Sequence, residues 1–500
     1  MTILIFALIA LTVVALLVLV HRWLWIRLVR DTSRPGGGWR RAGTALAFAL
    51  PLLSVAALVA GRAGVPFWLQ RVVSWPGFMW LAVLLYLTLA MLIAEPLRAL
   101  LLRRGNRAAR LPGSGPGTPA PQSPEGLVGA AQASRGSAPD PAPQTPEGLD
   151  GMAAAGMGSG AEPRFREGAG RGTAPQAPAP APAPATGPAP GPGAGAAGEA
   201  TAPVGSQVDG TGSGEFGDAA GEVAVGVTRR TLIARAVGGA AAAAAVGTVG
   251  YGTYGVMRGP RVKRVQVPLA KLPRAAHGFR IAVVSDIHLG PILGRAHTQR
   301  IVDAVNRTQP DAIAIVGDLV DGTVHDLGPA AEPLRRLRAR HGSYFVTGNH
   351  EYFSGAQPWV EHVRELGLTP LENARRALPH FDLAGVNDIA GEREGQGPDF
   401  QAALGDRDRA RAAVLLAHQP VVIHDAVRHG VDLQLSGHTH GGQLWPGNYI
   451  AELANPTVAG LERYGDTQLY VSRGAGAWGP PVRVGAPSDI TVVELASYQA

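Results

Sequence analysis

The C-terminal half of the chain is predicted to fold as an α/β domain, and the N-terminal part to be a membrane anchor. From Val262 onward, short apolar runs alternate with amphipathic helical patterns, which is typical of a sheet covered by helices. Before that point, long apolar runs reach the length needed to cross a bilayer. The expected regions are a membrane anchor with three transmembrane helices (1–110), a Pro/Ala/Gly-rich linker (111–227), a fourth hydrophobic span (228–257) and the α/β domain (262–500).

Composition excludes several classes of function. The chain of 500 residues is too long for one core, so more than one region is expected. It has no cysteine, which excludes disulfides, thiolate metal sites and cysteine nucleophiles. The net charge of +7 comes mostly from arginines that flank apolar segments. No basic stripe is interleaved with aromatic residues, so no nucleic-acid partner is expected.

Three apolar segments near the N-terminus are predicted to cross a membrane. They are Ile3–Val20, Thr44–Ala60 and Phe78–Ala94. A cleaved signal peptide is disfavoured for the first, because no cation precedes it and no small-residue cleavage site follows it. None has an ionisable residue at its middle, so a transport pathway is not supported and the segments are interpreted as an anchor.

Basic residues are distributed unevenly around these segments. The loop 21–41 and the stretch 98–110 are rich in arginine, whereas the connector 61–77 holds only Arg62 and Arg71. By the positive-inside rule, the arginine-rich sides face the cytoplasm and the N-terminus lies outside.

The segment 111–227 is predicted to be disordered. It is rich in Pro, Ala and Gly and has almost no aromatic residue, so it buries too little apolar surface to offset its ordering entropy. It contains an imperfect duplication, PAPQSPEGLVG at Pro119–Gly129 and PAPQTPEGLDG at Pro141–Gly151, which is interpreted as duplicated linker.

The fourth span, 228–257, begins with the paired arginines Arg229 and Arg230. The pattern is similar to a twin-arginine export signal placed inside the chain. A soluble Ala-rich helix is the alternative, since the run is only weakly hydrophobic. If the span is entered from the cytoplasm, the following domain lies outside the cell membrane. The basic residues just beyond it, from Arg258 to Arg264, favour the opposite orientation.

The α/β domain contains nine expected strands and four expected helices. The strands are Val262–Val267, Arg280–Val284, Ala312–Val316, Ser343–Val346, Phe381–Ala384, Ala413–Leu416, Val431–Leu435, Gln468–Val471 and Ile490–Leu495. The helices are Ala296–Arg307, Ala330–Arg340, Pro358–Leu366 and Val421–Arg428. The stretch Gly391–Asp408 breaks the alternation and is predicted to be a surface loop.

Five of these strands end in polar motifs. The motifs are Ser285-Asp286-Ile287-His288, Gly317-Asp318-Leu319-Val320-Asp321, Gly348-Asn349-His350-Glu351, Ala417-His418 and Gly437-His438-Thr439-His440. Each alone has an ordinary explanation as a turn or a packed histidine. Together they place ligand-type side chains at strand ends, where α/β sheets bind their ligands. Oxygen and imidazole donors without cysteine suit a pair of divalent metal ions, such as Mn, Fe or Zn.

This ordered set of motifs resembles the five blocks of the calcineurin-like metallophosphoesterase family, over about Phe279–Leu495. The segments GHTHGGQLWP and YVSRGAGAWGPPVR, with the N-terminal spans, are similar to its bacterial membrane-anchored, YkuE-type branch. The resemblance implies a two-sheet αββα sandwich with a binuclear metal site.

The resemblance also implies roles for the residues of the motifs. Asp286, His288 and His440 would hold the first metal, Asn349, His418 and His438 the second, and Asp318 would bridge both. His350 would protonate the leaving alkoxide or bind the phosphate, and Asp321 and Glu351 would orient histidine N–H groups. Trp445 and Trp478 are interpreted either as the lining of a substrate groove or as core residues.

The resulting expectation is a multi-pass membrane phosphoesterase that hydrolyses phosphomonoesters or phosphodiesters with a metal-activated hydroxide. Its substrate is expected to be lipid-linked, nucleotide-linked or part of the cell envelope, and its catalytic domain to be extracytoplasmic. The alternative is a membrane-tethered binding or scaffold protein with a catalytically silent domain. That alternative predicts eroded ligand positions, whereas all seven are occupied by suitable residues.

Overall fold

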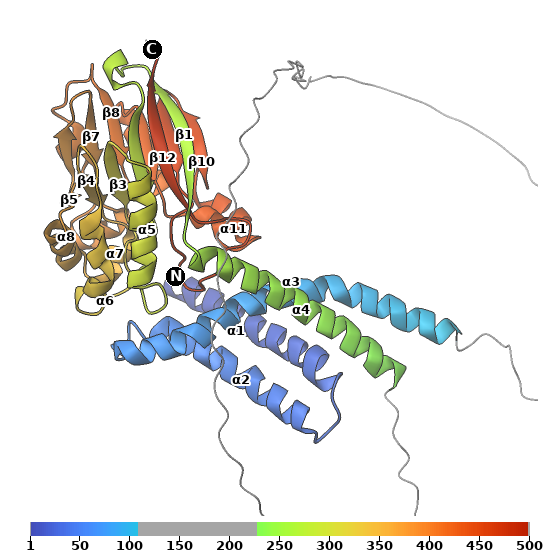
Figure 1. Ribbon diagram of the computed structural model, residues 1–500. Coiled ribbons are helices and arrows are strands. Elements are labelled where there is room, and N and C mark those ends of the chain that lie inside the picture. The colour runs from blue at the N-terminus through green and yellow to red at the C-terminus, as the bar shows by residue number, and fades with distance from the viewer. Residues whose placement is uncertain (1, 109–227, 499–500) are drawn as a thin grey trace, which may run out of the picture. The chain divides into compact units, whose positions relative to one another are not determined.

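The computed structural model describes residues 2–108 and 228–498 (Figure 1). The predicted linker and its duplication lie outside the described residues. The described residues 2–108 and 228–498 belong to one compact unit, which contains both the long helices and the α/β domain.

Among the described residues, four helices have the length and apolar composition needed to cross a membrane. α1 is Thr2–Trp25, continued by a π-helical turn at Ile26–Arg30, and the others are α2 (Gly38–Val59), α3 (Phe67–Ala108) and α4 (Arg229–Met257). Each predicted segment lies largely within one of them, and α3 extends beyond its segment on both sides. α2 and α3 approach closely at Gly77, where a Cβ atom would collide with the Leu53 carbonyl group.

The strands form two six-stranded sheets. The first has the order β1-β12-β2-β3-β4-β5, and the second β10-β11-β9-β8-β7-β6. The first contains β1 (Arg261–Leu269), β2 (Phe279–Val284), β3 (Ala312–Val316), β4 (Ser343–Val346), β5 (Thr369–Pro370) and β12 (Asp489–Ser497). The second contains β6 (Ala374–Ala377), β7 (Phe381–Gly385), β8 (Ala412–Leu416), β9 (Leu433–Ser436), β10 (Gly460–Tyr464) and β11 (Thr467–Val471).

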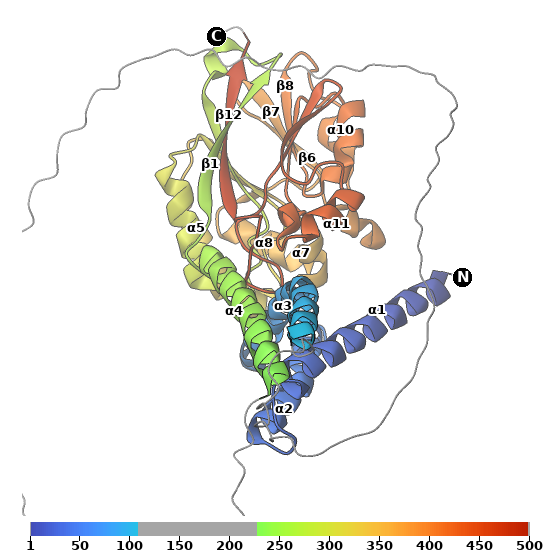
Figure 2. The same cartoon turned by 90° about the vertical axis from the view of Figure 1, so that its right-hand side faces the viewer.

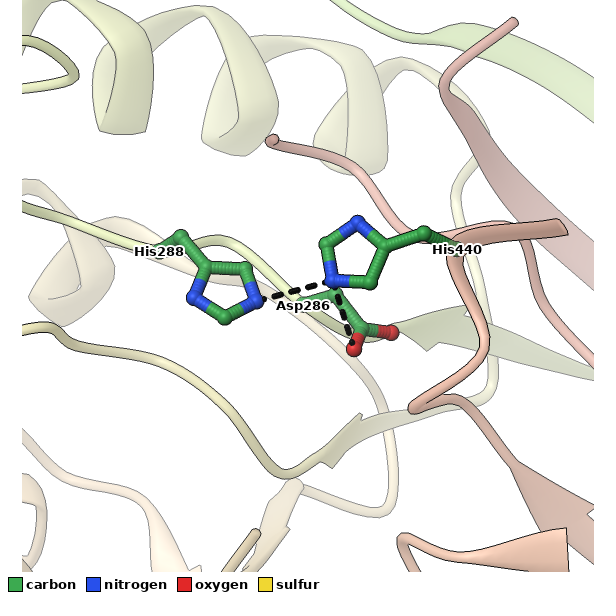
Figure 3. A group of neighbouring side chains, drawn as sticks. All are labelled: Asp286, His288 and His440. Atoms are coloured by element: carbon green, nitrogen blue, oxygen red, sulfur yellow. Dashed lines mark hydrogen bonds and ion pairs between the residues drawn. The ribbon is translucent and has the colours of Figure 1, made fainter. Parts of the chain in front are cut away.

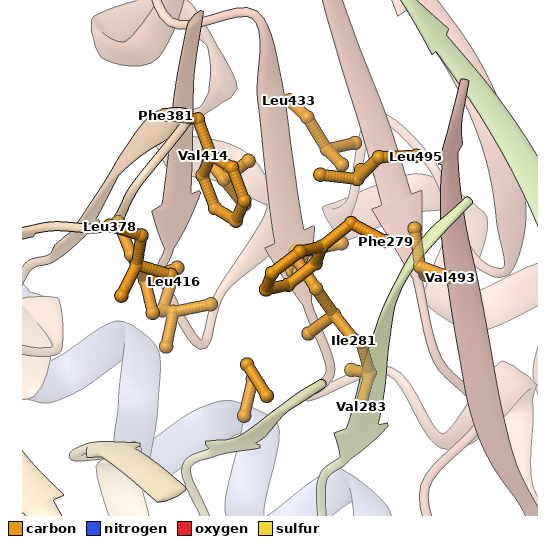
Figure 4. Packing of buried hydrophobic residues seen from close by; sticks show 14 of the residues in the cluster. Phe279, Ile281, Val283, Leu378, Phe381, Val414, Leu416, Leu433, Val493 and Leu495 are labelled. Atoms are coloured by element: carbon orange, nitrogen blue, oxygen red, sulfur yellow. The ribbon is translucent and has the colours of Figure 1, made fainter. Parts of the chain in front are cut away.

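Apolar side chains from both sheets form the central core. Phe279 and Ile281 of β2 face Phe381 of β7 and Val414 of β8 (Figure 4), and the rings of Phe279 and Phe381 meet edge to face at 5.0 Å. This packing is the consequence of the alternating apolar residues in the strands of the two sheets.

Helices cover the outer faces of both sheets (Figure 2). α5 (Arg295–Arg307), α6 (Val324–Ala331) and α8 (Ala356–Glu365) share an apolar cluster with β2, β3 and β4. α9 (Phe400–Leu404) and α10 (Ile423–Arg428) share another with β7, β8 and β11. The predicted αββα sandwich is therefore confirmed. The remaining short helices of the described part are α7 (Asn349–Ser354), α11 (Gly447–Ala454) and 3-10 turns at Arg274–Ala276, Glu332–Arg336, Ile389–Glu394, Pro420–Val422 and His440–Gly442.

The structure differs from the sequence prediction in three ways. All nine predicted strands are present, but β5, β6 and β10 were missed because they are short edge strands with polar or charged residues. The helix predicted at Ala330–Arg340 is wrong. α6 ends at Ala331 and a 3-10 turn follows, in a segment where Pro329 and Pro333 remove backbone donors. The predicted surface loop Gly391–Asp408 is wrong in part, since it contains α9 and buries Phe400 and Arg407.

Candidate metal centre

The predicted site residues follow strands that run side by side in the two sheets. β2, β3 and β4 are parallel neighbours in one sheet, and β8 and β9 are parallel neighbours in the other. Because parallel strands end at the same edge, the side chains that follow them converge. Asp286 and His288 follow β2, Asp318 follows β3, Asn349 follows β4, His418 follows β8, and His438 and His440 follow β9.

The backbone is left-handed at five of these seven positions. The φ angles are 53° at Asp286, 48° at His288, 53° at Asp318, 71° at His438 and 53° at His440. Non-glycine residues adopt this conformation rarely, and it persists only where the surroundings enforce it. The chain thus turns sharply after β2, β3 and β9, as expected of a site that must gather side chains from separate strands.

Glu351 enforces the turn at Asp318. Its buried carboxylate accepts N–H groups from Gly348 (2.6 Å), Asp318 (3.0 Å) and Leu319 (2.8 Å). The expectation that Glu351 orients a histidine N–H group is therefore wrong. Its hydrogen bonds instead join the turn after β3 to the turn after β4, because it lies one turn into α7 with its carboxylate directed back at the backbone.

One cluster of potential metal ligands contains Asp286, His288 and His440 (Figure 3). One ligand atom from each lies within 4.8 Å of the others. His288 Nε2 and His440 Nε2 are 2.9 Å apart, and His440 Nε2 is 3.4 Å from Asp286 Oδ1. This is the set that the sequence assigns to the first metal.

A second cluster contains Asp318, His418 and His438, again within 4.8 Å of one another. Asn349 joins it through Oδ1, which lies 3.0 Å from His438 Nδ1. Asp318 also belongs to a group with His288 and His350, so its carboxylate lies between the two clusters. The structure brings together all seven residues predicted to bind metal.

The arrangement of lone pairs fits bound cations. His418 Nδ1 donates to the Val316 carbonyl oxygen at 2.8 Å, which leaves Nε2 of the neutral ring as an acceptor. This buried Nε2 faces Asp318 Oδ2 at 3.1 Å and has no hydrogen-bond donor among the described residues. His288 Nδ1 similarly donates to Asp321 Oδ1 at 3.0 Å, so its Nε2 lone pair faces the first cluster. Both Nε2 atoms are thus directed into the clusters, where a metal ion can take the place of a proton.

At His438, His440 and Asp318 the electrostatics favour the form that binds metal. At His418 they do not, because, although burial opposes this, the charge of Asp318 raises the His418 pKa well above its usual value, so a metal ion would replace the Nε2 proton. Burial, with the neighbouring His418 ring, lowers the pKa of His438 to about 4. Burial and the charge of His288 hold the pKa of His440 well below its usual value. Although burial opposes its ionisation, the ion pair with protonated His418 in the metal-free protein holds the pKa of the Asp318 carboxyl well below its ordinary range. Neutral imidazole and ionised carboxylate are the ligand forms of these groups.

His350 lies at the mouth of the site. Its Nδ1 is 2.6 Å from Asp321 Oδ1, so Asp321 accepts hydrogen bonds from two histidines, His288 and His350, as the sequence suggested. Although burial works in the other direction, this hydrogen bond and the charge of Asp321 raise the pKa of His350 to about 9. The rings of Phe353 and Trp478 contact His350 at centroid distances of 5.7 and 5.8 Å.

The two tryptophans are exposed, so the interpretation as core residues is wrong. Trp478 is 55% exposed and Trp445 is 50% exposed. Both lie in surface segments, and the contact of Trp478 with His350 places its ring at the mouth of the site.

Sequence reasoning missed Arg483. This buried arginine donates to the His440 carbonyl oxygen and lies 3.0 Å from His440 Nδ1, and its Nε donates to the Gly476 carbonyl oxygen. It therefore fixes the backbone and the ring of a predicted metal ligand. The only signal was its position in the segment YVSRGAGAWGPPVR, which carries no recognised ligand spacing.

Comparison with known proteins gives a consistent result. The family model "Calcineurin-like phosphoesterase" matches residues 279–442, which include all seven predicted ligands. The chain is 40% identical over 259 residues to "Transmembrane protein with metallophosphoesterase domain" of Danio rerio, covering 49% of this chain and 59% of that protein. It is 33% identical over 240 residues to an uncharacterized metallophosphoesterase of Aquifex aeolicus, and the match covers 47% of this chain and 91% of that protein. It is 28% identical over 285 residues to the uncharacterized metallophosphoesterase YkuE of Bacillus subtilis, and the match covers 54% of this chain and 98% of that protein. The match thus spans less than two thirds of the Danio rerio protein.

Proposed function

Because the chain belongs to the calcineurin-like phosphoesterase family, we propose that it is a membrane-anchored, metal-dependent hydrolase of phosphomonoesters or phosphodiesters. The observation that carries this proposal is the convergence of two clusters of potential ligand atoms on the Asp318 carboxylate.

Seven side chains would hold two divalent cations, which we propose to be Mn, Fe or Zn. Asp286, His288 and His440 would bind one, Asn349, His418 and His438 the other, and Asp318 both. When bound, such a pair supplies a hydroxide nucleophile at neutral pH and neutralises charge on the phosphoryl oxygens. Asp321 holds the proton on His288 Nδ1, so that Nε2 remains available as a ligand.

His350 is the proposed catalytic residue. Its Nδ1 proton is held by Asp321 Oδ1, which leaves the Nε2 proton of the imidazolium for the substrate. In the metal-free protein, with a pKa of about 9, His350 is protonated at neutral pH. It can then protonate the leaving alkoxide or bind a phosphoryl oxygen.

Contacts within the compact unit support an extracytoplasmic catalytic domain. The connector between α2 and α3, which is poor in arginine, meets the domain. The Arg62 guanidinium carbon lies 5.9 Å from the Phe353 ring centroid, and Phe67 packs against the helix-covered face of the first sheet. At the arginine-rich end of the bundle, Arg98 pairs with Asp31 at 2.9 Å and Arg235 donates to the Thr32 carbonyl oxygen. By the positive-inside rule, these contacts favour the outer side of the cell membrane for the catalytic domain.

Substrates of this site are proposed to be lipid-linked or envelope phosphoesters. A catalytic domain that packs on its own membrane helices stays close to the bilayer, and an external site would not meet a cytoplasmic nucleotide-linked intermediate. No nucleic-acid partner is proposed.

The test is hydrolysis of aryl phosphoesters by the full chain in lipid nanodiscs, measured with added Mn, Fe or Zn and with chelator. Metal-dependent activity is expected for the natural sequence and for the control His325→Ala, an exposed histidine outside the motifs. Asp318→Asn and His438→Ala are expected to abolish it. Full activity in both of these variants would contradict the proposal. A metal-loaded chain that is inactive on every phosphoester class would favour the scaffold alternative.

A further inference from the structure

Helix α11 presents an apolar face to its surroundings. None of its eight residues is buried, and the exposed fractions are 59% at Tyr449, 71% at Ile450 and 87% at Leu453. At about 100° per residue, these three side chains fall within one arc of the helix, and Glu452 falls outside it. Such a face is unfavourable in water, so it indicates a binding surface.

Exposed aromatic residues also lie between α11 and the metal centre in the chain, and at the mouth of that centre. α11 begins shortly after His440, and the exposed Trp445 lies between them. The exposed rings of Trp478 and Phe353 contact His350. We call these six residues the apolar rim: Phe353, Trp445, Tyr449, Ile450, Leu453 and Trp478.

The rim is attached to the middle of a predicted membrane span. The Tyr86 hydroxyl group of α3 donates to the Trp445 carbonyl oxygen at 3.0 Å. Tyr86 lies near the centre of the apolar segment Phe78–Ala94. The adjoining residues Leu444 and Val482 belong to one apolar cluster with residues of α3 and α4. Backbone that precedes α11 is thus held against the part of α3 that a bilayer would surround.

α4 is joined to the site by a second contact. Its Gly252 carbonyl oxygen accepts the backbone N–H group of Arg483, whose side chain fixes His440. A Cβ atom at Gly252 would lie 2.7 Å from Val482 Cγ1, so glycine is needed for this approach. The segment that contains Trp445 and the segment that contains Arg483 therefore both contact helices that have the length and composition of membrane spans.

We propose that the apolar rim is inserted into the same lipid leaflet that surrounds α3 and α4. The occupant is the bilayer itself, because the segments that carry Trp445 and Arg483 pack directly on α3 and α4, which have the length and composition of membrane spans. Aromatic residues at its edge and Arg62 beside Phe353 suit the headgroup region. When the rim is inserted, the metal centre lies at the depth of the phosphoester headgroups of the membrane lipids. The substrate class, a lipid phosphoester, rests on the proposed function, whereas the insertion of the rim does not.

The absence of cysteine allows a direct test of depth in the full chain. A bimane label would be placed in lipid nanodiscs on Leu453→Cys, and its emission quenched with iodide in water or with lipids brominated in their acyl chains. We expect brominated lipid to remove most of the emission and iodide to remove little. Ile93→Cys, on an exposed position of α3, is the membrane reference, and Asp466→Cys, on an exposed turn of the second sheet, is the aqueous reference.

Quenching of the 453 label by iodide to the level of the 466 label would overturn the proposal. So would protection from both quenchers, which would indicate that a second copy of the chain covers the rim. Because no hydrolysis is measured, failure of the proposed enzyme activity does not affect this result. The lipid substrate is tested separately by comparing Leu453→Asp with the natural sequence on a vesicle-embedded phosphoester and on a water-soluble aryl phosphoester. Insertion predicts a larger loss of activity on the vesicle substrate, and equal losses would overturn the assignment of lipid phosphoesters.

Discussion

His350 illustrates what a single residue decides at this site. Its ring meets Asp321 on one side and the exposed mouth on the other, which suits proton transfer to a leaving group. We expect His350→Gln to lower kcat/KM by about 10²–10⁴-fold on an alkyl phosphoester, whose leaving group needs a proton, and far less on a p-nitrophenyl ester. His325→Gln is the matched control. Equal losses on both esters would instead assign His350 to phosphate binding.

The pKa of His350 also predicts a pH dependence of stability for the metal-free protein. The folded pKa of about 9 is above the unfolded value of about 6.5, so protonated His350 stabilises the folded state. This contribution is complete below about pH 6.5 and is lost as the pH rises through about 9. The difference in thermal midpoint between the natural chain and His350→Gln, measured with chelator, should therefore shrink over that interval. A difference in thermal midpoint that stays constant from pH 6 to 10 would be evidence against an ion pair between His350 and Asp321.

Among the elements, the turns after β3 and β4 carry the clearest prediction. Glu351 accepts three backbone N–H groups there and thereby positions the Asp318 carboxylate. Glu351→Gln replaces an acceptor oxygen with a donor NH₂ group, which leaves buried N–H groups unpaired at about 1–3 kcal/mol. We expect a lower thermal midpoint and a reduced metal content by elemental analysis. Glu361→Gln, at an exposed position of α8, is the control and should change neither quantity. Unchanged metal content in the Glu351 variant would mean that the turn keeps its conformation without the hydrogen bonds to Glu351.

At the scale of the whole molecule, the direction of the helices in the membrane can be tested. Single cysteines would be introduced at Asp466, on the catalytic domain, and at Gly36, in the arginine-rich loop. In intact cells, a membrane-impermeant maleimide should label position 466 and should reach position 36 only after permeabilisation, because the proposed orientation puts the arginine-rich loop in the cytoplasm. The reverse pattern would place the catalytic domain inside the cell.

Much of the fold was predictable, because local patterns specify the elements that they form. The strands that carry the site are short apolar runs followed by a polar turn, so Ala312–Val316 and Ser343–Val346 were predicted to the residue. The edge strands β6 and β10 were not, since their pairing depends on a neighbouring strand and leaves no apolar run in the sequence.

The sequence by itself determined which residues are available as metal ligands, because the donor atoms of Asp, Asn and His at the strand ends belong to the side chains themselves. Only the tertiary structure decided how they are held. The carboxylate of Glu351 turned to the backbone instead of a histidine, and the distant Arg483 reached His440 across 43 residues of chain. Only the tertiary structure, too, joined Tyr86 of α3 to Trp445 beside the site. Such contacts depend on which surfaces the packed sheets and helices bring together, and no spacing along the chain encodes them.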